Sequence, residues 1–184
     1  MAYNPNLHHR RSIRIAGYDY SQAGAYYVTI CITGRRCILG EIVAGEMRLN
    51  ELGAIVQREW CRLPRHYSTM DLDAFVVMPN HVHGVIFLKD SRGKTVRRRP
   101  LFEIVRGFKT WSARRINGKR NSSGTPVWQR DYYEHIVRDE DDLNRIRHYI
   151  AGNPAKWEED SENPANWPST TVGAGLVPNR GRVR

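Results

Sequence analysis

Two histidines separated by one residue are the sharpest chemical feature of this 184-residue chain. In a β-strand, side chains two residues apart point to the same face, so His81 and His83 would project together while Val82 points into the core. Two imidazoles on one face can share a divalent cation such as Mg²⁺, Mn²⁺ or Zn²⁺. The alternative is a pair of surface histidines on an edge strand, and the spacing alone favours that alternative.

A tyrosine and an asparagine form the second candidate pair. Tyr149 precedes Asn153 by four residues, and on a helix this spacing places both on one face. A phenol oxygen can attack phosphorus when a metal ion neutralises the developing charge, and an amide oxygen could bind the same ion. The alternative has Tyr149 packing against Ile146 and Ile150 while Asn153 ends the helix. The helical pattern alone favours this alternative.

The elements that must position these residues follow from the periodicity of the apolar side chains. Strands are expected over residues 25–32, 73–79, 81–88 and 127–137, with a hairpin over 36–49. Helices are expected over 50–63, opened by Asn50 and ended by Pro64, and over 100–116 and 139–153. This order predicts an α+β sandwich, with a mainly antiparallel sheet and the helices packed on one face.

The composition suits one folded domain with terminal extensions. Hydrophobic residues make up 40% of the chain and charged residues 26%, which is enough for one core. We expect a basic arm over 1–24, a central domain over 25–157 and a loosely ordered tail over 158–184. The chain shows neither an apolar run that could span a bilayer nor a signal peptide, and its three cysteines form no close pair. A cytoplasmic protein with reduced thiols is therefore expected.

The basic charge is concentrated in one stretch. The chain has a net charge of +10, and residues 92–120 alone contain eleven basic side chains against Glu103. Such a field attracts polyanions, including nucleic acids. The alternative is a solvated helix face, but such faces usually mix both signs of charge. The charge itself does not distinguish DNA from RNA.

Several motifs resemble one known family, the REP-associated tyrosine transposases. These form a domesticated branch of the single-tyrosine transposases, within the His-hydrophobic-His endonuclease superfamily. The similar segments occur in family order and span about residues 10–160: SIRIAGYDYSQAGAYYVTICI (12–32), LNELG (49–53), VVMPNHVHGVI (76–86), VWQRDYYEHIVRDEDDL (127–143) and YIAGNPAKWEED (149–160). The resemblance implies a ferredoxin-like fold, with the histidines on a central strand and the tyrosine on a following helix.

The resemblance also implies a chemistry. His81 and His83 would bind Mg²⁺ or Mn²⁺, and Asn153 stands where related transposases place a third ligand, often glutamine. Tyr149 would be the nucleophile that attacks a phosphate of single-stranded DNA at the foot of a hairpin. The attack would leave a free 3′-OH and a 5′-phosphotyrosine link, and a 3′-OH could then reverse it.

The implied partner is hairpin or single-stranded DNA, with no membrane, no small-molecule substrate, and nucleoid association in the cytoplasm. Phosphates would be held by a set of basic side chains, namely Arg97, Arg98, Arg99, Arg106, Lys109, Arg114 and Arg115. Bases near the N-terminal arm would meet Arg10, Arg11 and Arg14. The protein could act as a monomer or a homodimer. Two alternatives stay open: a nucleic-acid-binding protein that has lost activity, and a metal-dependent nuclease that uses water.

Overall fold

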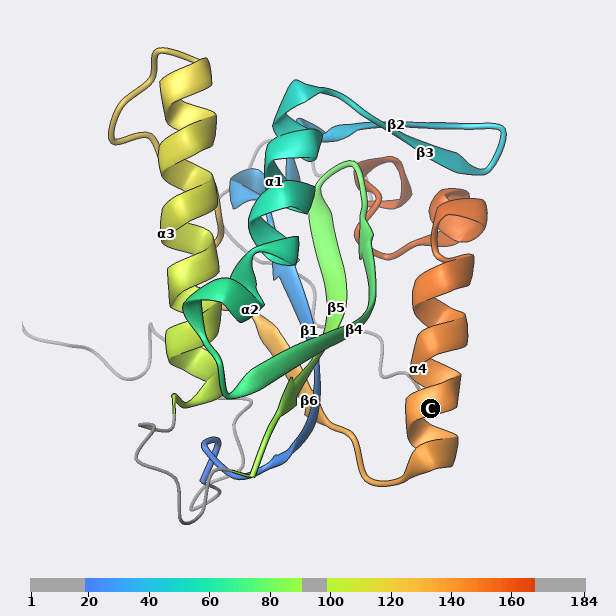
Figure 1. Cartoon of the computed structure of the whole chain (residues 1–184). Coiled ribbons are helices and arrows are strands. Elements are labelled where there is room, and N and C mark those ends of the chain that lie inside the picture. Colours follow the sequence, from blue (N-terminus) through green and yellow to red (C-terminus); the bar gives the residue numbers. More distant parts are fainter. Residues whose placement is uncertain (1–18, 91–98, 168–184) are drawn as a thin grey trace, which may run out of the picture.

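A four-stranded antiparallel sheet forms the centre of the computed structural model, which describes residues 19–90 and 99–167 (Figure 1). The strand order is β4-β5-β1-β6. The strands are β1 (Gly24–Cys31), β4 (Met70–Val77), β5 (His81–Leu88) and β6 (Tyr133–Ile136). A separate hairpin is formed by β2 (Gly40–Val43) and β3 (Glu46–Leu49).

Four α-helices and three short 3₁₀ turns complete the described part of the chain. The helices are α1 (Glu51–Cys61), α2 (Leu63–His66), α3 (Leu101–Lys119) and α4 (Glu140–Gly152). The turns are η1 (Thr33–Arg35), η2 (Pro154–Glu159) and η3 (Pro164–Asn166). Within residues 19–90 and 99–167, no helix is long and apolar enough to cross a membrane.

The chain order of the sheet and its connecting helices is that of a ferredoxin-like fold. Strand β1 leads through α1 to the β4–β5 pair, and α3 then leads to β6, which returns to the far edge beside β1. This strand–helix–strand, strand–helix–strand order in one antiparallel sheet is the split βαβ arrangement. The predicted fold class is confirmed.

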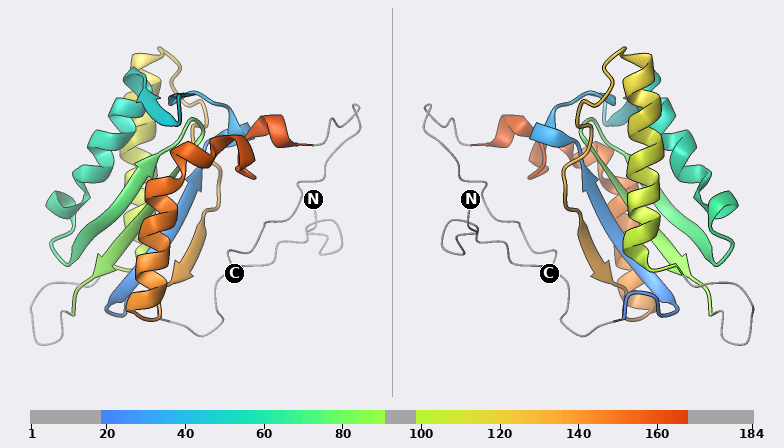
Figure 2. Two further views of the ribbon diagram at one scale, coloured as in Figure 1. Left: turned by 90° about the vertical axis from the view of Figure 1, so that its right-hand side faces the viewer. Right: turned by 90° about the vertical axis from the view of Figure 1, so that its left-hand side faces the viewer.

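The helices cover both faces of the sheet. Helices α1 and α3 pack on one face, against a core that includes Tyr26, Val28 and Ile86 (Figure 2). Helix α4 lies on the opposite face, where Leu143, Ile146 and Ile150 pack against Ala25, Tyr27 and Val85. The expectation that the helices share one face therefore holds for α1 and α3 and not for α4. Strand β1 is buried along nearly its whole length, so both of its faces are covered.

Two of the three predicted helix starts, at Asn50 and Asp139, are confirmed by capping bonds. The Asn50 side chain accepts hydrogen bonds from the amides of Leu52 and Gly53, at 2.9 and 3.0 Å. The Asp139 side chain accepts from the amide of Asp142 at 2.8 Å and so opens α4. Each cap satisfies backbone donors that a helix start leaves without partners.

The predicted strand over 127–137 is shorter in the structure. Only Tyr133–Ile136 pairs with β1, and Trp128 forms an isolated bridge with Ile32. Between them, the ammonium group of Lys109 donates to the carbonyls of residues 129, 130 and 131, at 3.1, 3.3 and 3.0 Å. These carbonyls turn toward one cation and cannot also extend a ladder of strand hydrogen bonds.

Close packing of Trp60 on Gly84 predicts a strong effect of one added methyl group. A Cβ at Gly84 would lie 2.3 Å from Cζ2 of Trp60, whose ring is stacked on Phe75 and meets the edge of Phe108. We expect Gly84→Ala to lower the free energy of unfolding by about 1–3 kcal/mol, because the Trp60 ring cannot move aside without straining the packed core. Urea denaturation measures this change.

Gly118→Ala is the matched control, since a Cβ there would meet nothing within 4 Å. We expect this variant to be neutral or slightly stabilising, because alanine favours a helix over glycine by up to about 1 kcal/mol. Equal stability losses in the two variants would contradict the packing argument.

Candidate active site

His81 and His83 lie side by side in the buried centre of the sheet. Their side chains are 0% and 3% exposed and face the α4 side, whereas Val82 faces the α1/α3 core. The predicted common face is therefore confirmed. The edge-strand alternative is wrong, since β5 runs between β4 and β1. Two adjacent buried imidazoles need partners, and the surrounding residues determine what those partners can be.

Asn80 determines the protonation of His81. The Asn80 amide nitrogen donates to the carbonyls of Arg35 and Glu162, at 2.9 and 2.8 Å. Its Oδ1 is therefore the atom that faces Nδ1 of His81 at 2.8 Å, and it accepts a hydrogen bond from that nitrogen. Because Nδ1 carries the proton, Nε2 of neutral His81 has a free lone pair, as a metal ligand requires.

His83 presents the same nitrogen toward the same point. Its Nε2 lies 2.9 Å from Nε2 of His81, and its Nδ1 lies 2.7 Å from the Tyr27 hydroxyl and 2.9 Å from that of Thr29. Two ligands about 2.1 Å from one cation and at right angles to each other would be about 3 Å apart. The separation of the two nitrogens thus fits a shared cation, and without one a proton must lie between them.

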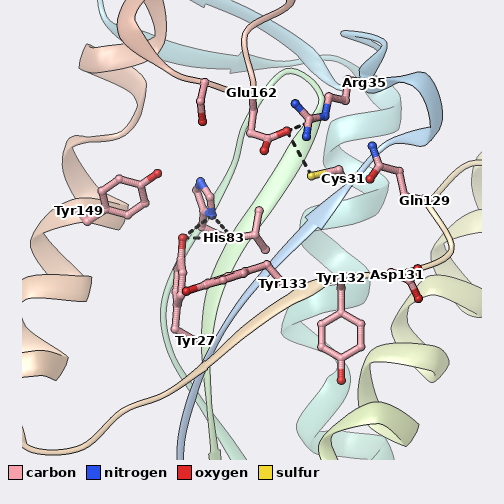
Figure 3. Close-up of a pocket in the computed structure, with 12 residues that line it drawn as sticks. Tyr27, Cys31, Arg35, His83, Gln129, Asp131, Tyr132, Tyr133, Tyr149 and Glu162 are labelled. Carbon is pink, nitrogen blue, oxygen red and sulfur yellow. Dashed lines mark hydrogen bonds and ion pairs between the residues drawn. The ribbon is translucent and has the colours of Figure 1, made fainter. Parts of the chain in front are cut away.

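Tyr149 extends from α4 toward the histidines (Figure 3). Its ring centre lies 5.3 Å from that of His83 and 6.3 Å from that of Tyr27, and both contacts are edge-on. The same side chain also packs beside the α4 core cluster. The packing alternative and the chemical one are therefore compatible, because one edge of the ring faces the core and the other faces a pocket.

A double hydrogen bond helps to fix the position of α4. The Arg147 guanidinium donates to both carboxylate oxygens of Asp73 on β4, each at 2.8 Å. This planar, two-point contact restrains rotation of the helix about its axis. Together with Leu143, Ile146 and Ile150, it keeps Tyr149 over the sheet of its own chain.

Two buried oxygen atoms that follow Tyr149 in the chain have no hydrogen-bond partner within the described part of the chain. They are Oδ1 of Asn153 and Oδ2 of Asp160, and the Asp160 oxygen lies 3.9 Å from Nε2 of His81. The donor atoms of His81, His83 and Asp160 all lie within 4.8 Å of one another. Leaving such oxygens unpaired is costly, and a bound cation would satisfy them.

Asp160 was not among the predicted site residues. It falls in the segment assigned to a tail, and it belongs to none of the predicted helices or strands. The only signal was its place as the last letter of the YIAGNPAKWEED motif. In the structure, η2 turns the chain back after α4, so that residues 160–163 lie over the histidines.

Burial determines the ionisation of these groups. It lowers the pKa of His83 to about 3 and that of His81 well below its usual value, so both are neutral and able to bind a metal. Burial also raises the pKa of Tyr149 to about 12, with a further increase from the nearby Asp160 carboxylate. Hydrogen bonds from Asn153 and Tyr27 act in the opposite direction by stabilising the phenolate.

A pocket opens beside Tyr149 and His83. Its wall is formed by Tyr27, Tyr133, Gln129 and Arg35, among other residues (Figure 3). Arg35 was not predicted as a site residue, although it is the cationic side chain nearest the histidines among those that line this pocket. The arrangement combines a phenol, two neutral imidazoles, buried oxygens and one guanidinium, which is a set suited to phosphate chemistry.

Half of the ten predicted DNA-binding residues are described by the structure, and these five lie away from the pocket. Arg10, Arg11, Arg14, Arg97 and Arg98 are outside the described residues. The others lie at the start of α3 or on it, and thus on the face of the sheet opposite α4 (Figure 2). Within residues 99–120, no side chain lines the tyrosine pocket, although the Lys109 ammonium donates to the carbonyl of Gln129 in the pocket wall.

The described basic side chains differ in how they are engaged. Arg99 pairs with Glu103 and Arg115 with the buried Glu59, both at 2.9 Å. Burial lowers the pKa of Lys109 to about 8. Arg106 and Arg114 are exposed, and no acidic side chain among residues 19–90 and 99–167 forms an ion pair with either.

A family model and two curated proteins match this chain. The family described as "Transposase IS200 like" matches residues 58–153. A Haemophilus influenzae protein named "Uncharacterized protein" is 39% identical over 177 residues, covering 86% of this chain and 95% of the relative. A second H. influenzae protein, named "Putative REP-associated tyrosine transposase", is 27% identical over 148 residues, covering 75% of this chain and 74% of its own.

A solved structure shares the fold. It is titled a REP-associated tyrosine transposase bound to a REP hairpin, and it has a TM-score of 0.58 at 18% identity. The match covers 93% of this chain and 100% of the other. The resemblance to REP-associated tyrosine transposases that was expected from the motifs is thus confirmed. Residues 58–153, which match the family model, include the histidine strand, all of α3 and α4, and Asn153. The chain therefore belongs to the IS200-like transposase family.

Proposed function

We propose that this protein cuts and rejoins single-stranded DNA through a covalent link between Tyr149 and a 5′-phosphate. Membership of a transposase family supports a DNA-processing role in general. The observation that carries the specific proposal is the approach of the Tyr149 ring to the buried imidazole of His83, whose Nε2 lies 2.9 Å from Nε2 of His81. A phosphate that enters the adjoining pocket would meet the nucleophile and this point together.

A divalent cation fits the site on the evidence of its donor atoms. His81 and His83 would hold Mg²⁺ or Mn²⁺ through Nε2, and Asn153, whose Oδ1 has no hydrogen-bond partner within the described residues, would be a further ligand. Imidazole and oxygen ligands together suit Mn²⁺ well. When bound, such a cation neutralises negative charge on the phosphate that is attacked.

The side chains around Tyr149 control the nucleophile. The phenol keeps its proton at neutral pH, and the Asn153 and Tyr27 hydrogen bonds stabilise the phenolate as the proton leaves. In the reaction, the phenol oxygen forms a bond to phosphorus, the bond to the 3′-oxygen breaks, and that oxygen takes up a proton. One phosphodiester replaces another, so a 3′-OH can reverse the step without an external energy source.

Hairpin DNA is the proposed substrate, because the structural relative with the same fold is bound to a REP hairpin. The exposed Arg106 and Arg114 on α3 would contact phosphates, with Arg99 and Arg115 beside them and Arg97 and Arg98 preceding the helix. Because α3 and Tyr149 lie on opposite faces of the sheet, the DNA would reach around one edge of it. Such contacts give affinity and register and little sequence selection.

Loss of one hydroxyl group should abolish covalent chemistry. We expect wild-type protein to form an adduct with labelled single-stranded hairpin DNA in Mn²⁺, and Tyr149→Phe to form none, because the ring would remain without its nucleophilic oxygen. A denaturing gel separates adduct, cleaved strand and intact strand. Binding of the hairpin by Tyr149→Phe should stay within about threefold of wild type, a margin near 0.6 kcal/mol.

Tyr67→Phe is the matched control, since its hydroxyl donates to the Glu103 carbonyl, outside the pocket. It should form the adduct as wild type does. Cleavage without an adduct, and equal in Tyr149→Phe, would instead indicate a nuclease that uses water. Binding without cleavage in any metal would indicate a nucleic-acid-binding protein that has lost activity.

The role of α3 predicts a change in salt dependence. Replacing both Arg106 and Arg114 by alanine should weaken hairpin binding and reduce the slope of log K against log salt concentration by roughly 1–2, because fewer counterions are released. Fluorescence anisotropy between low and moderate salt measures the slope. Arg48→Ala, an exposed change on β3, serves as the control and should leave the slope unchanged. If the slope is unchanged in the double variant, Arg106 and Arg114 contact solvent and do not contact DNA phosphates.

A further inference from the structure

We propose that Asp160 is the anionic ligand of the cation site, and that the Arg35–Glu162 ion pair holds it there. This deepens the proposed function, because it concerns the cation that Tyr149 chemistry would use. The consequence is that the segment after α4, up to at least Asn163, belongs to the catalytic centre. The expected boundary between catalytic domain and tail at residue 157 would then lie too early.

The two oxygens of the Asp160 carboxylate have different surroundings. Oδ1 accepts a hydrogen bond from the amide of Glu162 at 2.7 Å. Oδ2 is buried, lacks a hydrogen-bond partner within the described residues, and points to the free nitrogen of His81 at 3.9 Å. Adjacent ligands of one cation would be about 3 Å apart and opposite ligands about 4.2 Å. The observed separation lies between these two values, so one cation could contact both atoms.

Asp160 can supply negative charge to the cation site, and the Asn153 amide cannot. The two imidazoles are neutral, so a divalent cation bound by them and an amide alone would keep its full charge in a buried place. The Oδ1 of Asn153 is uncharged, so it would add no negative charge to the site even as a ligand. A carboxylate whose side chain is only 5% exposed offers the compensating charge.

A set of contacts positions Asp160 through the residues that follow it. The Glu162 carboxylate pairs with Nε of Arg35 at 2.9 Å and accepts a weak hydrogen bond from the Cys31 thiol at 3.6 Å. The Glu162 carbonyl accepts from Asn80, the same residue that orients His81. One asparagine thus ties the histidine strand to the segment that carries Asp160.

The face of Arg35 away from Glu162 is also covered. Its guanidinium carbon lies 5.0 Å from the ring centre of Trp167, and the Trp167 indole donates to the Ser161 carbonyl at 3.1 Å. Segment 160–167 therefore folds back on itself around Arg35. Disturbing this pair should move Asp160 relative to the histidines without touching either of them, which makes Arg35 and Glu162 positioning residues.

The test of the ligand is Mn²⁺ binding by the full-length protein, followed through the electron paramagnetic resonance signal of free Mn²⁺. Asp160→Asn should weaken the affinity at least tenfold, while Glu159→Gln should stay within twofold of wild type. The control removes the same charge from the neighbouring, exposed residue. His81→Ala, which removes a ligand, should lose the site altogether.

A thermal scan separates a ligand from a merely structural residue. Mn²⁺ should raise the melting temperature of wild type and not that of Asp160→Asn. Without metal, Asp160→Asn should melt at the same temperature as wild type or higher, because it removes a buried negative charge whose Oδ2 has no hydrogen-bond donor within the described residues. If Asp160→Asn has a lower melting temperature than wild type without metal, and Mn²⁺ still raises that temperature, then Asp160 is a structural residue and the ligand assignment is wrong.

Substitutions of Arg35 and Glu162 test whether their ion pair positions Asp160. Arg35→Gln and Glu162→Gln should each weaken Mn²⁺ binding, on the order of tenfold as for other residues that orient ligands. Arg35→Lys keeps a cation beside Glu162 and should retain most of the affinity, and Glu158→Gln should change nothing. Equal affinity in all four variants would refute the role of the ion pair.

The outcomes also separate this inference from the proposed function. If wild type forms the Tyr149 adduct and binds Mn²⁺, while Asp160→Asn binds Mn²⁺ equally well, then the Asp160 assignment is wrong and the Tyr149 reaction stands. If Asp160→Asn loses Mn²⁺ and wild type forms no adduct, the ligand assignment stands and the reaction is wrong. Wild type that binds no Mn²⁺ would contradict both.

Discussion

The rest of the site depends on one constraint, which is that two neutral imidazoles face each other 2.9 Å apart in the closed centre of a sheet. Two lone pairs at that distance repel unless a proton or a cation lies between them. Water cannot relieve the repulsion, because both side chains are buried. Asn80 accepts a hydrogen bond from Nδ1 of His81, so the proton of the neutral ring stays on Nδ1 and Nε2 is free to bind. The second nitrogen then completes a pair whose arrangement fits a metal.

The fold places other side chains, including the proposed nucleophile, around His81 and His83. Strand β1 contributes Tyr27 and Thr29 against His83, and α4 brings Tyr149 over the sheet face that α1 and α3 leave uncovered. Segment 160–163 then covers the side of His81, with Asp160 inside. Every one of these groups comes from a single chain, and each is tied to the next by a hydrogen bond, an ion pair or a ring contact.

Local patterns in the sequence predict part of this arrangement. The spacing of His81 and His83 predicts their common face, and Asn50 and Asp139 mark helix starts that the capping bonds confirm. Helical periodicity shows which side of α4 is buried, but it does not show against which face of the sheet. Contacts between distant segments determine the position of Asp160 and the hydrogen bonds from Lys109 to three carbonyls. Neither feature produces a periodic pattern in the sequence.

The central claim is that Tyr149 forms the covalent bond to DNA. Tandem mass spectrometry of the adduct, after digestion by trypsin and a nuclease, locates that bond directly. The account predicts a nucleotide attached through its 5′-phosphate to the tyrosine of the peptide spanning residues 148–156, which reads HYIAGNPAK. A nucleotide on any other residue, or on Tyr149 through a 3′-phosphate, would contradict it.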